Sequence, residues 1–289
     1  MHVLTLIAPQ HSGALTPALL AQVTQAANAA PPIILSPGEA ADLLCPTPPD
    51  PAAVKKALNG APIDTVLTAQ KNRRKRLLIA DMDSTVVTGE TLDELAAFAG
   101  VGARVAAITT RSMNGEIDFA AALRERVALL QGLPLDALEK TWTGVRLTEG
   151  ARTLVQTMQT HGATTALVSG GFTWFTARVA QRCGFTHHRA NILLDDGASL
   201  LGRVQEPILD REAKLATLRE IATAAHLDLA DCLAVGDGAN DLAMIRAAGL
   251  GVAYHAKPIV AGQAQARIEH TNLRALLFIQ GYAADEFAA

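Results

Sequence analysis

Four short apolar runs constrain the fold of this chain more than any other feature of its sequence. They span residues 77–80, 165–168, 232–235 and 249–253, and stretches of helical composition separate them. Strands that are apolar on both faces and alternate with helices are typical of a parallel sheet covered on both sides. The pattern therefore predicts an α/β fold with a doubly wound parallel sheet, whose chemistry lies beyond the carboxyl ends of the strands.

The interval between the first two runs is too long for a single crossover. A βαβ unit needs roughly 30 residues or somewhat more, yet 86 positions separate Asp83 from Ser169. Four segments within this interval have helical composition: residues 90–99, 103–110, 118–130 and 135–142. We therefore predict an inserted helical bundle over about residues 90–146. An insertion at the strand ends would form a cap over the site.

Residues 1–72 predict a separate, small α/β domain that precedes a larger domain of residues 73–289. Within it, residues 1–8 and 63–69 favour strands and residues 15–30 favour a helix. Residues 71–76 hold five basic side chains in six positions. Such a charge run is typical of a solvated linker ahead of a buried strand, and it marks the predicted domain boundary.

Composition excludes several classes of function. The 289 residues include 25 basic and 28 acidic side chains, a formal net charge of −3, so no nucleic-acid or anionic-membrane partner is expected. The longest uncharged apolar stretch, residues 153–177, is interrupted by polar residues and a Gly-Gly pair, so it does not predict a membrane-spanning helix. Three scattered cysteines predict no disulfide framework, which favours a cytoplasmic location.

The first apolar run leads directly into two acids, Asp81 and Asp83. Burial of unpaired charge is costly, so packing gives no reason for two acids at this position, whereas a divalent cation would supply one. In a structural alternative, Asp83 or Ser84 caps a helix and Asp81 lies in a loop. That alternative accounts for one acid and leaves the other unexplained.

The run at residues 232–235 also leads into two acids, Asp237 and Asp241, with glycines beside them. Glycine lets the backbone approach a bound group closely. Carboxylates at adjacent strand ends, with no His or Cys among them, suit Mg²⁺ better than zinc. Taken alone, residues 236–241 are as typical of a turn before a capped helix as they are of a metal site. The first pair of acids favours the metal site.

Two further features point to an anion. Ser169, Gly170 and Gly171 follow the run at residues 165–168 and precede a helical stretch, where backbone N–H groups and the helix dipole favour negative charge. A Gly-Gly turn with a serine cap is also a common structural motif. Lys214 lies in a helical stretch, where a lone lysine is usually solvated, so it counts only together with the other motifs.

The order of these motifs resembles that of the haloacid dehalogenase superfamily of phosphohydrolases. The resemblance covers residue 77 to the C-terminus, and it implies the Rossmann-like core of that superfamily with a helical cap. Within the superfamily, residues 81–90 (DMDSTVVTGE) and 112–127 (SMNG, then Phe119 and LRERV) are similar to the phosphoserine phosphatases. Residues 1–72 resemble the small ACT-like domains that precede some members.

The resemblance implies a covalent mechanism. Asp81 would attack phosphorus and become an aspartyl phosphate. Asp83 would protonate the leaving oxygen and then accept a proton from the attacking water. A Mg²⁺ ion would be held by Asp81, the backbone carbonyl of Asp83 and Asp237, with Asp241 supporting them from behind.

The resemblance also implies a substrate site. Ser169, the N–H group of Gly170 and Lys214 would neutralise the phosphoryl oxygens. Asn240 would contact the substrate or its phosphate.

The cap residues would recognise the amino-acid part of the substrate. A phosphorylated amino acid carries an ammonium and a carboxylate group, so its pocket needs an acid and an arginine. Glu90 and Arg126 occupy those positions of the family motif, with Met113 and Phe119 as apolar walls. Either charged residue alone is also typical of a solvated helix position.

The expected function is Mg²⁺-dependent hydrolysis of O-phospho-L-serine to L-serine and phosphate, the last step of serine biosynthesis. One alternative is a phosphatase or phosphotransferase for another small metabolite, such as phosphohomoserine or phosphothreonine. Another is a signalling domain that holds an aspartyl phosphate without turnover. Against the signalling domain stand the second acid, Asp83, and the large cap. The sequence leaves a homodimer open.

Overall fold

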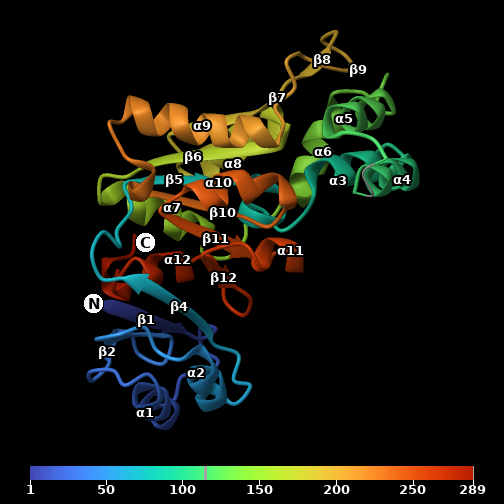
Figure 1. Cartoon of the computed structure of the whole chain (residues 1–289). Coiled ribbons are helices and arrows are strands. Elements are labelled where there is room, and N and C mark those ends of the chain that lie inside the picture. Colours follow the sequence, from blue (N-terminus) through green and yellow to red (C-terminus); the bar gives the residue numbers. More distant parts are fainter. Residues whose placement is uncertain (114–115, 289) are drawn as a thin grey trace.

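The computed structural model describes residues 1–113 and 116–288 of the chain, and the side chains of Met113 and Arg211 are not described. Its strands form a six-stranded, a four-stranded and a two-stranded sheet (Figure 1). The largest sheet is wholly parallel, with the order β12-β11-β10-β5-β6-β7. Its strands are β5 (Leu77–Ala80), β6 (Thr164–Phe172), β7 (His187–Asn191), β10 (Cys232–Gly236), β11 (Leu250–Tyr254) and β12 (Ala266–Ile268).

Helices cover both faces of this sheet, which confirms the predicted doubly wound fold. Alternate residues of β5 face opposite sides: Leu78 packs into one apolar core and Leu77 into another. The first core includes side chains of α7 (Ala151–Thr160), α8 (Thr173–Cys183) and α12 (Ala275–Ile279). The second includes side chains of α9 (Arg211–Ala224) and α10 (Leu242–Ala247). A short helix, α11 (Pro258–Ala261), follows β11.

The long interval between β5 and β6 holds the predicted helical bundle. Its helices are α3 (Thr91–Phe98), α4 (Gly102–Met113), α5 (Phe119–Ala128) and α6 (Asp136–Gly144). The chain enters and leaves this bundle side by side, because Thr88 N donates to Arg146 O at 3.0 Å and Thr148 N to Val86 O at 2.9 Å. Figure 1 shows the bundle at one end of the central sheet. We call these helices the cap.

A hairpin that the sequence did not predict lies against the cap. It consists of β8 (Leu193–Asp195) and β9 (Leu200–Val204), and β9 contacts α5 (Figure 1). Backbone hydrogen bonds join it to the loop after α5: Gly132 N donates to Leu200 O at 2.8 Å, and Leu200 N to Leu133 O at 2.9 Å. The hairpin is therefore bonded to the cap, although in the sequence it follows β7 of the central sheet.

The N-terminal unit is an antiparallel four-stranded sheet with the order β2-β3-β1-β4 and two helices. Its elements are β1 (His2–Ile7), α1 (Pro17–Ala26), β2 (Ile33–Ser36), β3 (Ala40–Cys45), α2 (Pro51–Leu58) and β4 (Asp64–Ala69). Both helices begin with proline after a capping side chain, Thr16 and Asp50 respectively. The sequence predicted β1, α1 and β4 but missed the other three elements. That residues 1–72 are an ACT-like domain stays a prediction.

The prediction of a solvated linker at residues 71–76 is wrong for two of its side chains. The guanidinium group of Arg73 forms an ion pair with Asp42, with nitrogen–oxygen distances of 2.6 and 3.0 Å. Lys75 is buried, and its Nζ donates to the backbone carbonyls of Asn72 and Ala230. The charge run is partly solvated, but it also carries side chains that the fold buries against distant acceptors.

Four short turns complete the described chain: Met82–Val86, Leu229–Asp231, Ala239–Asp241 and Ala284–Glu286. None of the helices within the described residues is long and apolar enough to cross a membrane.

Candidate active site

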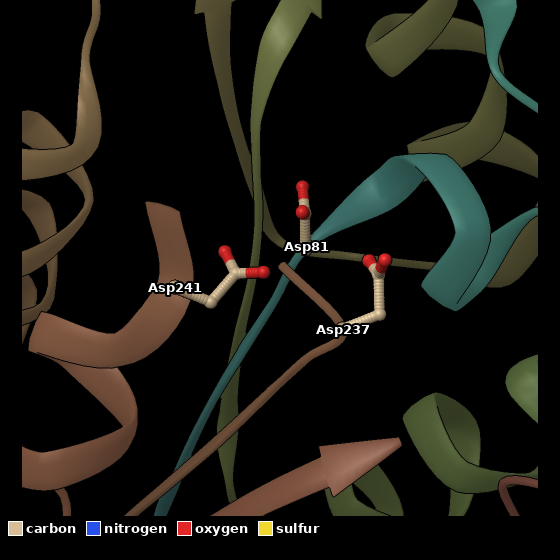
Figure 2. Close-up of side chains that lie close together, drawn as sticks. All are labelled: Asp81, Asp237 and Asp241. Carbon is tan, nitrogen blue, oxygen red and sulfur yellow. The ribbon is translucent and has the colours of Figure 1, made fainter. Parts of the chain in front are cut away.

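Three carboxylates converge at the carboxyl ends of β5 and β10 (Figure 2). Asp81 follows β5 directly, whereas Asp237 and Asp241 lie just beyond β10. The two strands are neighbours in parallel register, with Ala80 opposite Val235, so their ends meet at one edge of the sheet. One carboxylate oxygen from each of the three acids lies within 4.8 Å of the other two. The fold thus brings together acids that are far apart in sequence.

Lys214, from α9, neutralises part of this charge. Its Nζ lies 2.7 Å from Asp81 Oδ1 and 2.6 Å from Asp241 Oδ1, and the whole side chain is buried. Burial alone lowers the pKa of Lys214, but the negative charges of Asp241 and Asp81 outweigh it and raise the pKa above its usual value. Lys214 is therefore protonated. Asp241 also accepts a hydrogen bond from Gly238 N at 3.0 Å.

The carboxylate of Asp83 points away from the three-acid cluster toward hydrogen-bond donors. Oδ1 accepts from Thr91 N and Thr91 Oγ1, each at 2.8 Å, and Oδ2 accepts from Ser169 Oγ at 3.0 Å. Burial, together with the charge of Asp81, raises the pKa of Asp83 to about 6, against the opposing effect of these hydrogen bonds. A carboxyl group with such a pKa can give up and take back a proton near neutral pH.

The Ser-Gly-Gly motif lies in a strand and not at a helix N-terminus, which corrects the sequence prediction. β6 continues through Gly170 and Gly171 to Phe172, and α8 begins only at Thr173. Its N–H groups are arranged by a strand irregularity, because the pairing of β6 with β7 shifts between Val168 and Phe172. The predicted contribution of the helix dipole therefore does not apply directly to this motif.

Position 171 leaves little room for a side chain because the backbone approaches Asp83 closely. A Cβ atom at this position would lie 3.1 Å from Asp83 Oδ2 and 3.1 Å from Ser169 Oγ. The N–H group of Gly171 donates to Ser169 Oγ at 2.8 Å, and that hydroxyl donates to Asp83. The motif is therefore connected directly to the first pair of acids.

The cap brings its predicted residues toward this edge. Phe119, the first residue of α5, faces Gly170: a Cβ atom on that glycine would lie 3.0 Å from the ring. Glu90 accepts a hydrogen bond from Ser84 Oγ at 2.6 Å. Partial burial in this acidic crevice, with the charges of Asp83 and its neighbours, raises the pKa of Glu90 to about 7.

The structure gives fewer contacts for the remaining predicted residues, Arg126, Asn240 and Met113. Arg126 is on α5, where its Nε donates to Ala122 O at 3.3 Å. Burial lowers its pKa, and the charges of Asp93 and Glu90 oppose this. Asn240 lies in the turn after β10, with its amide oxygen against Gly238. The side chain of Met113, and the neighbouring residues 114–115 of the SMNG segment, lie outside the described residues.

Two threonines support the acids in ways that the sequence analysis did not assign. Thr91 supplies two of the three hydrogen bonds to Asp83. Thr85, which is fully buried, donates to Asp237 Oδ1 at 3.2 Å. The Asp-x-Asp-x-Thr pattern contains Thr85, so a signal existed for that residue. Thr91 lies eight positions from its partner, and no local spacing indicates the contact.

The donor set of the three-acid cluster fits a hard divalent cation. The groups are carboxylates, which supply oxygen ligands, and burial and mutual repulsion raise the pKa of Asp237 above its usual value. Carboxylates crowded in this way are stabilised by a cation between them. A family comparison supports this interpretation of the cluster.

Residues 75–249 match the family model of haloacid dehalogenase-like hydrolases. The chain belongs to this family, whose members generally use a divalent metal. Relatives at 38–45% identity include proteins named phosphoserine phosphatase. That of Archaeoglobus fulgidus is 45% identical over 202 residues, which are 70% of this chain and 59% of the relative. The chain thus spans about three fifths of that relative's length.

Solved structures extend the similarity. A probable phosphoserine phosphatase from Vibrio cholerae has a TM-score of 0.82 and 29% identity, and the match covers 99% of this chain and 88% of that one. A structure described as a phospho-aspartyl intermediate analogue of phosphoserine phosphatase has a TM-score of 0.66 and 40% identity, over 71% of this chain and 98% of that one. The first match includes the N-terminal unit.

Proposed function

We propose that this chain is a Mg²⁺-dependent phosphoserine phosphatase, which hydrolyses O-phospho-L-serine to L-serine and phosphate as the last step of serine biosynthesis. The observation that carries the proposal is the pair Asp81 and Asp83. One acid is held at the end of a central strand by Lys214, and the other has a pKa of about 6 beside it. The named relatives support the substrate.

In the proposed mechanism Asp81 is the nucleophile. Its Oδ1 accepts hydrogen bonds from Met82 N and Lys214 Nζ, both at 2.7 Å, which leaves Oδ2 to attack phosphorus. The new bond joins Oδ2 to phosphorus while the bond to the serine oxygen breaks. Asp83 gives its proton to that oxygen, so that neutral serine leaves. Water then attacks phosphorus, Asp83 takes its proton, and Asp81 is regenerated with release of phosphate.

Positive charge and N–H groups stabilise the phosphoryl oxygens as negative charge develops on them. We assign this to Lys214, Ser169 and the N–H of Gly170. Asn240 would add a contact to substrate or phosphate. Mg²⁺ would be held by Asp81, Asp237 and the backbone carbonyl of Asp83, with Asp241 behind them, and it supplies Lewis-acid polarisation of the phosphoryl group.

The cap would supply specificity for the amino acid. Glu90 would bind the ammonium group and Arg126 the carboxylate of the substrate, with Phe119 and Met113 as apolar walls. The proximity of Phe119, the first residue of α5, to Gly170, a residue of the proposed phosphoryl site, supports this assignment. The three cysteines, Cys45, Cys183 and Cys232, are all free, which fits a cytoplasmic location.

The test is phosphate release from a panel of phosphorylated metabolites by the full chain, with Mg²⁺ or with EDTA. Phosphoserine is expected to be the best substrate, and EDTA is expected to stop release. Asp81→Asn should lower kcat by on the order of 10⁴-fold or more, whereas Asp285→Asn, an exposed control, should not change it. A phosphotransferase would instead pass the phosphoryl group to added homoserine. Substantial turnover by folded Asp81→Asn would refute the covalent mechanism.

A further inference from the structure

A buried carboxamide, Asn191, connects residues 169–171 to the hairpin that contacts the cap. We call residues 169–171 the phosphate-binding turn, after their proposed role. The pairing of β6 with β7 explains why a side chain is needed at this point. From Val168 to Phe172 β6 advances four residues, while β7 advances two, from Arg189 to Asn191. The extra residues of this bulge belong to the segment Ser169–Gly171, and their backbone groups leave the regular ladder. A carbonyl group freed in this way needs another donor.

Asn191 provides that donor. Its side chain is 3% exposed, and its Nδ2 donates to Gly170 O at 2.8 Å. Its Oδ1 accepts from Leu209 N at 2.7 Å. A carboxamide can do both at once because it is neutral and carries a donor and an acceptor, whereas a carboxylate of the same size has only acceptors.

Two of the three side-chain hydrogen bonds given for Asn191 join it to Leu209: Oδ1 accepts from Leu209 N at 2.7 Å, and Nδ2 also donates to Leu209 O at 3.4 Å. Asn191 is the last residue of β7 and Leu209 follows the hairpin, so these bonds close the hairpin at its root. The other end of the hairpin is bonded to the cap loop, where Gly132 N donates to Leu200 O. The turn at Gly170 is therefore linked to the cap by Asn191, and it contacts the cap directly through Phe119.

The Gly170–Gly171 peptide is held at both ends. Asn191 binds its oxygen, and Ser169 Oγ accepts its N–H at 2.8 Å. Peptides between two glycines rotate at little steric cost, so the local backbone does not fix this one. If it rotated, Ser169 would lose its N–H donor, and the hydroxyl that donates to Asp83 would no longer be oriented.

We propose that Asn191 is a positioning residue that fixes the Gly170–Gly171 peptide and, through Ser169, orders the phosphate-binding turn. Asn191 also closes the root of the hairpin. The conformation of the phosphate-binding turn therefore depends on the positions of the hairpin and the cap. The inference rests on the proposed function for the phosphate contacts of Ser169 and Gly170. It goes beyond that function in assigning a residue that contacts neither substrate nor metal.

The test measures binding of inorganic phosphate to the full chain with Mg²⁺ by titration calorimetry, together with kcat/KM for phosphoserine. Asn191→Ala is expected to weaken phosphate binding about tenfold, which corresponds to about 1.4 kcal/mol, and to lower kcat/KM by at least that factor. Asn191→Asp keeps the acceptor for Leu209 N at 2.7 Å but loses the donor to Gly170 O and the longer contact to Leu209 O. It therefore provides a second variant that keeps the shorter bond at the root of the hairpin, and it is expected to bind phosphate at least as weakly.

Gln280→Ala is the matched control. Gln280 is also a buried carboxamide with both contacts satisfied: its Oε1 accepts from Lys75 N at 2.9 Å and its Nε2 donates to Leu276 O at 2.8 Å, on elements that hold none of the site residues. Its loss should lower the thermal stability and leave phosphate affinity within about twofold of wild type. Equal losses of phosphate affinity in the Asn191 and Gln280 variants would overturn the proposal, as would wild-type affinity in both Asn191 variants.

Failure of the proposed function has a different signature. A wild-type chain that binds phosphate but does not hydrolyse phosphoserine would refute the function, and the phosphate affinities of the variants would still decide the role of Asn191. A wild-type chain that binds no phosphate would remove the contacts assigned to Ser169 and Gly170, and the proposal for Asn191 would be overturned with them.

Discussion

The N-terminal unit and the cap both lie against the central α/β region, but they are attached to it by different contacts. Buried acids anchor the N-terminal unit. Asp42 pairs with Arg73, Glu39 pairs with Arg274 at 3.0 Å, and Asp64 accepts hydrogen bonds from backbone N–H groups of residues 269–271. Each of these carboxylates would be left without its partner, and partly desolvated, if the unit separated.

The cap shares buried apolar side chains, such as Leu95 and Leu123, with the main core, but its ionic contacts are solvated. Its two connections run side by side at Thr88 and Arg146, and the ion pairs given for the described residues between the cap and the rest of the chain are partly or largely exposed. In the pair of Arg124 with Glu206 of the hairpin, the side chains are 54% and 55% exposed. Exposed ion pairs contribute little to stability, whereas breaking a buried one is costly. The comparison indicates that ion pairs contribute more to the attachment of the N-terminal unit than to the attachment of the cap.

The largest predicted effect comes from breaking the fixed attachment. Asp42→Ala removes the carboxylate from an Arg73 side chain that is only 12% exposed. Removal of one partner of a buried pair costs about 3–5 kcal/mol, and we expect about 3 because two backbone carbonyls still accept from Arg73. Urea unfolding should show this loss of unfolding free energy. The kcat/KM of the folded protein should stay unchanged, and a large drop in kcat/KM would mean that this interface supports the site.

Features that form a continuous pattern along the sequence could be predicted, whereas contacts between distant residues could not. The strand ends with their acids form continuous patterns, so Asp81, Asp83, Asp237 and the central sheet were all predicted. Arg73 was interpreted as part of a solvated linker because its partner, Asp42, lies 31 positions away. Only the folded chain brings these two residues together.

Missed elements have a similar explanation. β2 has only four residues and is joined to β3 by a tight turn that contains Gly38, and the hairpin of β8 and β9 has few residues to show a periodicity. The role of Asn191 depends on a bulge in a neighbouring strand, which no sequence pattern marks. The role of the Ser-Gly-Gly motif stays a prediction, and the helix expected at its glycines begins only at Thr173.

The next prediction tests whether Arg126 of the cap recognises the carboxylate of the substrate. If Arg126 binds the substrate carboxylate as proposed, Arg126→Ala should lower kcat/KM for phosphoserine about 30-fold to a few hundred-fold, because it would remove one partner of a charge-assisted, largely desolvated contact. Hydrolysis of an aryl phosphate, which has no carboxylate, should change about threefold or less. Equal losses on both substrates would assign Arg126 to the fold or to the phosphoryl site.

A smaller effect concerns the pH dependence of stability. Several acids of the candidate site have raised pKa values, whereas the acids of the N-terminal interface are paired with arginine side chains or backbone N–H groups. The pKa of Asp83 is raised to about 6 and that of Glu90 to about 7 in the folded chain. A folded chain with raised carboxyl pKa values binds more protons than the unfolded chain, so its stability falls as pH rises from about 4 to 7. Mg²⁺ bound as proposed would offset the negative charge of the deprotonated site.

Mg²⁺ should therefore raise the Tm more at pH 8 than at pH 5. A difference of about 1 kcal/mol would appear as roughly 2–4 °C in a chain of this size. Thermal unfolding with Mg²⁺ and with EDTA at both pH values provides the measurement. An equal Mg²⁺ effect at the two pH values would show that the carboxylates do not hold the ion in this way.

The smallest predicted effect is at the cap edge, where Arg124→Ala removes the ion pair with Glu206. The 2.8 Å contact joins α5 to the base of the hairpin, yet both side chains are about half exposed, so water replaces most of what is lost. We expect unfolding free energy to fall by less than about 1 kcal/mol, against about 3 for Asp42→Ala. Urea unfolding of the two variants side by side makes the comparison directly. A loss for Arg124→Ala as large as that for Asp42→Ala would mean that this exposed pair contributes as much as the buried pair, and the contrast between the ionic contacts of the cap and those of the N-terminal unit would be wrong.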